Sequence, residues 1–191
     1  MENCSLLRVE WLSLVLCCVV ALQFSSKCSA AKDVLYEGFE QYNGTEVGEF
    51  ILRVKKLNRT TSALFGTINL KKDLGADHNI DINFFHSPKG NQQFNHYPMK
   101  IPKTNMCDFT KNVFPDYEKY YKDVVDNIFQ VGDCPITARE MTMNNHILDS
   151  NMFSPYNPSG LWRAVIKVED SSGEGFTVAW TMNAYGENYF G

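Results

Sequence analysis

The chain has 191 residues, of which 21% are charged, and its formal net charge is -4. This length predicts one domain, or at most a small domain with an accessory segment. The charge is only mildly negative and no basic patch is interleaved with aromatic residues, so the composition argues against nucleic acid as a partner.

The first residues of the chain are typical of a secretory leader. The run Trp11–Phe24 is uncharged and mostly apolar, but it is shorter than the roughly 20 residues that a membrane-spanning helix needs. Small residues follow it, and signal-peptidase cleavage after Ala30 or Ala31 fits them. We therefore predict a cleaved signal peptide at 1–30 and one secreted, extracellular domain at 31–191 that has no transmembrane span. A retained signal anchor is the alternative, because acidic residues offset the basic charge near the N-terminus.

Removal of the leader leaves two of the six cysteines, Cys107 and Cys134. An even number of cysteines in an oxidising compartment predicts a disulfide between them. Closing a loop of this size stabilises a fold by about 3.5 kcal/mol in the chain-entropy model. We expect no zinc site, since no further cysteine pair or histidine pair lies at ligand spacing.

Two N-glycosylation sequons lie early in the predicted domain, at Asn43 and Asn58. Glycosylation requires an exposed asparagine in a secreted chain, so both sites are expected in polar surface stretches. A third triplet, Asn157-Pro158-Ser159, is blocked by its proline. We therefore predict a secreted glycoprotein.

Most of the predicted domain alternates apolar and polar residues with a period of two, which is typical of strands with one buried face. The segments that alternate most clearly are 49–55, 61–70, 77–83, 161–168 and 176–183. The turn at 58–60 joins the first two segments, and the polar, glycine-containing turn at 170–175 joins the last two. The sequence thus predicts two β-hairpins, of which the C-terminal one is the clearer.

One segment departs from this alternation. From Pro115 to Gln130 apolar residues recur at steps of three and four, which predicts an amphipathic helix. Pro115 suits a first helical turn and Gly132 a C-terminal stop. The helix would lie between Cys107 and Cys134, whose disulfide would tether it to the sheets. The predicted fold class is therefore mainly β, a sandwich with one amphipathic helix inserted between the two cysteines.

Little in the sequence predicts catalysis. No serine lies in a nucleophile elbow, and both remaining cysteines are expected to be oxidised. The segment Asp77–Asp81 resembles the start of a calcium loop, but Ile82 stands at the glycine position and Pro88 at the glutamate position. The histidines show no metal-ligand spacing; they are His78, His86, His96 and His146. We expect no enzyme activity, no catalytic residue, no metal and no cofactor.

Aromatic residues make up 13% of the chain, and it has seven methionines. Many of them fall on the apolar faces of the predicted strands. Such residues fill the core of a sandwich, but they also adapt well to irregular apolar ligands. The alternation alone is compatible with a filled core and with a hollow one.

The order of motifs in the second half is similar to a known family. Cys107 is followed by a helical stretch, by Cys134-Pro135-Ile136 and a strand, and then by 157–163 (NPSGLWR) before the last hairpin. This order resembles the insect secreted chemosensory proteins of the CheA and CheB type, which are distant relatives of the ganglioside activator protein and of the wider lipid-recognition (ML-like) superfamily. The resemblance covers nearly the whole predicted domain.

The resemblance implies an immunoglobulin-like β-cup whose two sheets splay to admit an acyl chain or a similar ligand. For the insect branch it also implies secretion around taste bristles and a role in pheromone or contact-chemical detection. The ganglioside activator has several disulfides, whereas this domain has cysteines for one, so the ligand class is not transferred with the fold.

These observations lead to the hypothesis of a secreted binding protein for small hydrophobic ligands such as a lipid, a cuticular hydrocarbon or a pheromone-like compound. A membrane receptor is a candidate second partner. One alternative is an extracellular interaction module with a filled core that acts as a receptor ligand or co-receptor; another is a lipid or glycan hydrolase. Strand alternation predicts the apolar wall residues Trp162, Ile166, Phe176, Trp180, Phe84 and Ile82.

Overall fold

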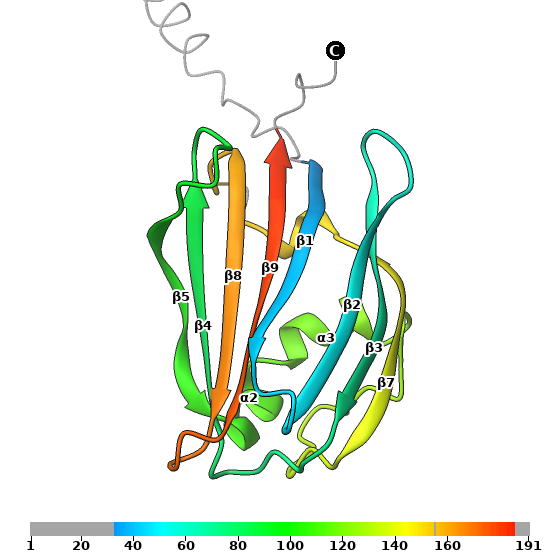
Figure 1. The fold of residues 1–191 in the computed structure, drawn as a ribbon, viewed down its shortest axis with the longest axis vertical. Helices are drawn as coiled ribbons and strands as arrows, with labels where there is room; N and C mark the ends of the chain where they lie inside the picture. Colours follow the sequence, from blue (N-terminus) through cyan, green and yellow to red (C-terminus); the bar gives the residue numbers. More distant parts are fainter. Residues whose placement is uncertain (1–32, 155, 186–191) are drawn as a thin grey trace, which may run out of the picture. The chain divides into compact units, whose positions relative to one another are not determined.

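Two antiparallel β-sheets face each other in the computed structural model (Figure 1). The structure describes residues 33–154 and 156–185, all of which belong to one compact unit, Ala31–Gly191. The signal peptide predicted at 1–30 lies outside the described residues. The predicted mainly β class is confirmed.

The five-stranded sheet has the order β1-β9-β8-β4-β5, and the four-stranded sheet has the order β2-β3-β7-β6. The strands of the first sheet are β1 (Asp33–Asn43), β4 (Asn79–Ser87), β5 (Asn95–Asn105), β8 (Gly160–Glu169) and β9 (Gly175–Tyr185). Those of the second are β2 (Gly48–Lys56), β3 (Ser62–Leu70), β6 (Val125–Asp126) and β7 (Arg139–Ile147).

Both predicted hairpins are present. β2 pairs with β3, and β8 pairs with β9, each in antiparallel register. The second hairpin closes through Asp170, whose side chain accepts hydrogen bonds from the backbone N–H groups of Ser172 (2.9 Å) and Glu174 (2.8 Å). An aspartate that bonds the backbone in this way favours a turn over a continued strand.

The prediction of one helix from Pro115 to Gln130 is wrong in extent and in number. Helix α3 begins at Pro115 as expected but ends at Tyr121, and a separate helix α2 (Met106–Asn112) precedes it. The chain leaves the helical path because Val125 pairs with Met143 to form β6. Apolar residues still recur after Tyr121 because their side chains face the core. The backbone there pairs as a strand, so the helical spacing of these residues no longer indicates a helix.

The predicted disulfide between Cys107 and Cys134 is confirmed, with a Cα–Cα distance of 5.2 Å. Cys107 lies in the first turn of α2, so the bridge attaches this helix to the segment that leads into β7. The asparagines of both sequons are exposed; Asn43 ends β1 and Asn58 lies in the β2–β3 turn. Both sites are therefore accessible to a glycan.

Side-chain hydrogen bonds connect the two sheets where β1 faces β2 and β3. The Gln41 Nε2 donates to the Gly48 carbonyl (2.7 Å), and its Oε1 accepts from the Phe50 N–H (3.0 Å). The hydroxyl of Ser62 donates to the carbonyl of Tyr36 (2.9 Å). Because these bonds join backbone to side chain across the sandwich, they fix the spacing of the sheets along this edge.

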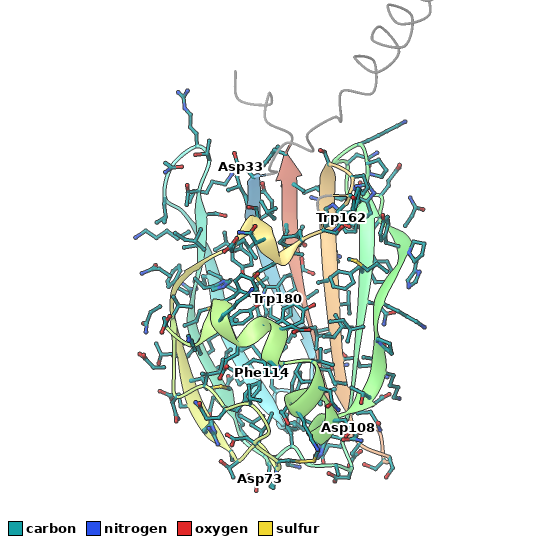
Figure 2. The ribbon with its side chains drawn as sticks, turned by 180° about the vertical axis from the view of Figure 1, so that it is seen from behind. Asp33, Asp73, Asp108, Phe114, Trp162 and Trp180 are labelled. Atoms are coloured by element: carbon teal, nitrogen blue, oxygen red, sulfur yellow. A yellow bond between two sulfur atoms is a disulfide. The ribbon has the colours of Figure 1, made fainter. Side chains whose placement is uncertain are left out.

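Helices α2 and α3 lie between the sheets on the other side of the molecule (Figure 2). The Asn105 side chain caps α2 by accepting from the Asp108 N–H at 2.9 Å. The α3 helix has proline in its first turn, where a missing N–H costs nothing. Short helices, not paired strands, therefore cover the space that the sheets leave on this side.

The fold makes a first prediction about stability. Leu64 on β3 is 0% exposed in the core, whereas Ile51 on the neighbouring strand is 54% exposed. We expect Leu64→Ala to lower the free energy of unfolding by about 2–5 kcal/mol. The control Ile51→Ala should change it by less than about 0.5 kcal/mol. Urea unfolding of both variants measures this difference, and equal effects would contradict the assignment of the buried face.

Candidate ligand-binding cavity

A cavity of about 540 Å³ lies between the two sheets. Protein interiors are packed so closely that they hold few voids larger than a water molecule. Pockets for small molecules typically measure roughly 300–1,000 Å³. The volume of this cavity therefore lies within the range of small-molecule pockets.

The wall of the cavity is almost entirely hydrocarbon and comes from every layer of the fold. The five-stranded sheet contributes Ile80, Ile82, Phe84, Met99, Ile101, Ala164, Ile166, Val168, Phe176, Val178, Trp180 and Met182. The four-stranded sheet contributes Phe50, Ile68, Leu70, Val125, Met141 and Met143. The two helices add Met106, Phe109, Tyr117 and Tyr121, the α2–α3 connection adds Phe114, and the segment after β6 adds Ile128 and Phe129.

Five of the six residues that alternation predicted for the wall line the cavity: Ile82, Phe84, Ile166, Phe176 and Trp180. Trp162 does not. Its side chain is 2% exposed, its Nε1 donates to the Pro158 carbonyl at 3.0 Å, and its ring packs against His86 and Tyr97. Trp162 faces inward as predicted, but it lies near the start of β8, where these rings fill the space around it.

The strand alternation does not mark the wall residues of α2 or of the segment before β8. Met106 and Phe109 stand at helical spacing and line the cavity. Met152 and Phe153, near the short helix η1 (Ser150–Met152), line it as well. The spacing of Met106, Phe109 and Val113 is a weak signal for α2 that could have been found. No periodic signal marks Met152 and Phe153, because they follow an irregular path.

A buried histidine joins three elements at the cavity wall. His146 on β7 is 2% exposed and its Nδ1 forms a 2.8 Å hydrogen bond with the hydroxyl of Tyr36 on β1. The ring of Tyr121 on α3 stacks on the imidazole, with centroids 4.8 Å apart. His146 therefore links the two sheets and the helical cover.

Burial keeps this cluster uncharged. Desolvation lowers the pKa of His146, although a hydrogen bond with the backbone of Tyr120 acts in the opposite direction. Desolvation also raises the pKa of Tyr36, and it raises the pKa of Tyr121 to about 12. At neutral pH the imidazole and both phenols are thus neutral, and the cavity wall beside them carries no charge.

The described residues give this site few charged groups and few possible metal ligands. Among the described lining residues, Lys100 alone carries a full charge. Within 33–154 and 156–185, no group of three or more His, Cys, Asp or Glu side chains is placed to hold a metal ion. None of the helices in the same ranges is long and apolar enough to cross a bilayer.

Comparison with known proteins adds no family assignment. No protein-family model matches the chain, and no curated protein matches its sequence. The resemblance to secreted chemosensory proteins therefore stays a prediction, and the cavity is the observation from which function is argued.

The burial of His146 predicts a pH dependence of stability. The unfolded chain protonates this imidazole near its ordinary pKa of about 6.5, whereas the folded pKa is lower. As the pH falls below about 6.5, the unfolded state takes up a proton that the folded state does not, so the free energy of unfolding decreases until the folded pKa is reached.

The variant His146→Gln removes this titration while it retains a hydrogen-bonding group for Tyr36. Urea unfolding of both proteins at pH values between about 8 and 5 tests the prediction. We expect the stability advantage of the wild type over the variant to shrink as the pH falls. An advantage that stays constant or grows on acidification would show that His146 is not the group responsible.

Proposed function

We propose that this chain is a secreted binding protein for small hydrophobic ligands, which occupy the cavity between its two sheets. The observation that carries the proposal is a cavity of about 540 Å³ whose wall is hydrocarbon and nearly free of charge. A genuinely empty cavity of roughly 150 Å³ already binds small apolar molecules. In this proposal the chain acts by binding and does not catalyse a reaction.

The driving force is the burial of hydrocarbon. Each methylene that leaves water contributes about 0.8 kcal/mol, and the cost of ordering the ligand offsets part of the sum. Aromatic rings and methionines adapt to the shape of an alkyl chain. Phe50, Phe176 and Trp180 from the two sheets would enclose such a chain together with Met141 and Met143.

The architecture supports an immunoglobulin-like cup with one fastened edge and one helical cover. The bonds of Gln41 and Ser62 fix the sheet spacing along the β1 edge. On the other side, α2 and α3 cover the cavity and are attached by the Cys107–Cys134 bridge. The helical cover, which has few strand hydrogen bonds to break, is the natural entry route for a ligand.

Secretion and a chemosensory role belong to the same proposal. The disulfide and the two exposed sequon asparagines fit an oxidising, extracellular environment. The order of motifs that resembles the CheA and CheB proteins supports contact-chemical detection, in which a receptor would read the loaded protein. The alternative of an interaction module with a filled core does not account for the cavity.

A cavity-filling variant tests the proposal. Ala164 on β8 is buried and lines the cavity, so Ala164→Phe would place a ring in the space that a ligand occupies. We expect the affinity for an environment-sensitive naphthylamine probe to fall at least tenfold, which corresponds to about 1.4 kcal/mol. Fluorescence titration measures this change.

The matched control is Val165→Phe, because the next residue on a strand points to the opposite face of the sheet and Val165 does not line the cavity. This control should bind the probe like the wild type. If both variants fold and bind the probe equally well, the probe does not enter the cavity and the proposal fails.

A further inference from the structure

Methionine is concentrated on the wall of the cavity. The chain has seven methionines, of which Met1 lies outside the described residues. The others all line the cavity: Met99, Met106, Met141, Met143, Met152 and Met182. Leucine is distributed differently, because Leu35, Leu52, Leu64 and Leu161 are buried without lining the cavity, whereas Leu70, Leu74 and Leu148 line it. Among the described residues, leucine therefore serves both the packed core and the wall, but methionine serves the wall only.

These methionines come from every layer of the fold. Met141 and Met143 lie on β7 of the four-stranded sheet, and Met182 lies on β9 of the sheet that faces it. The other three come from β5, from the first residue of α2 and from the last residue of η1; they are Met99, Met106 and Met152. A ligand between the sheets would thus contact thioether side chains on both sides.

Met143 has no side chain beside it on one neighbouring strand. It pairs with Val125 on β6 and with Gly66 on β3. Gly66 has a φ of 135°, and an added Cβ would collide with the carbonyl oxygen of Ile51, so only glycine fits at this position. The missing side chain leaves Met143 room to change between rotamers.

The physical chemistry of methionine sets it apart from the other apolar residues of the wall. Its side chain is unbranched, has three rotatable bonds and ends in a polarizable thioether, so it adapts to irregular shapes. Isoleucine and valine, in contrast, are branched at Cβ and stiff at χ1. Proteins that accept many partners use methionine-rich surfaces that can repack around each of them.

We propose that the methionine wall makes the cavity an adaptable site, which binds apolar ligands of similar size but different shape with similar affinity. Straight, branched and cyclic hydrocarbon skeletons all belong to this ligand class. A site for a single shape would instead be lined by side chains with well-defined rotamers, because flexible methionines specify a shape poorly. This inference rests on the proposed function and describes the range of ligands that the same cavity accepts.

Three alcohols with the same number of carbon atoms test the inference: straight dodecanol, branched butyloctanol and cyclododecanol. Each displaces the naphthylamine probe, and each affinity is corrected for the partition of that alcohol from water into octane. We expect the three corrected affinities of the wild type to agree within about fivefold. In the variant Met141→Ile/Met143→Ile the stiff side chains should widen this spread at least about tenfold.

The matched control is Leu52→Ile/Leu64→Ile. It introduces the same stiff side chains at buried positions of the same sheet that do not line the cavity. The control should keep the spread of the wild type. Met182→Ile, on the facing sheet, serves if the double methionine variant does not fold, and it should widen the spread about threefold.

Crystal structures of the wild type provide a test that needs no substitution. With dodecanol and with cyclododecanol bound in the cavity, we expect Met141 or Met143 to adopt different rotamers, because the side chains follow the shape of the ligand. The same rotamers at both positions in both complexes would contradict an adaptable wall.

The outcomes of the titrations separate the two proposals. If the wild type binds one alcohol more than about tenfold more tightly than the other two, the cavity is shaped for one ligand, and the inference fails while the hydrophobic site stands. The inference also fails if the spread is the same in the methionine variant as in the wild type, or if the leucine control widens it equally. If neither the probe nor any alcohol binds the wild type, the proposed function itself fails.

Discussion

The hydrogen bonds that join β1 to β2 and β3 are the constraint on which the cavity depends. β1 has irregular pairing with β9 near Tyr36 and again near Gln41, and irregularities of this kind bend a strand and strengthen its twist. The bend brings Gln41 and the Tyr36 carbonyl toward the other sheet, where Gly48, Phe50 and Ser62 bond to them. The sheets are therefore fastened at one edge. Away from it, the helices and large side chains lie between the sheets.

This arrangement explains why a core so rich in aromatic residues is not filled. Sheets that pack face to face interdigitate at about 10 Å, which leaves no room for a ligand between them. Here α2 and α3 are inserted between the sheets (Figure 2), and His146 ties the helical cover to both sheets through Tyr36 and Tyr121. The helices cover the side on which β1 does not fasten the sheets, and the volume between the sheets is lined almost entirely by apolar side chains.

The strands and their buried faces could be predicted because the alternation of apolar and polar residues indicates which side of a strand is buried. That is why Ile82, Phe84, Ile166, Phe176 and Trp180 were found. The helix end at Tyr121 could not be predicted, because the pairing of Val125 with Met143 depends on a strand far along the chain. The burial of Asn157 could not be predicted from its place in the blocked triplet and in the 157–163 motif, because it lies in an irregular loop.

The most direct test of a hollow between the sheets is a crystal structure of the protein with a terminally brominated alkyl ester. The account predicts an anomalous bromine peak inside the cavity, between side chains of both sheets. Bromine bound on the outer surface, or side chains that interdigitate and leave no space for an alkyl chain, would contradict it.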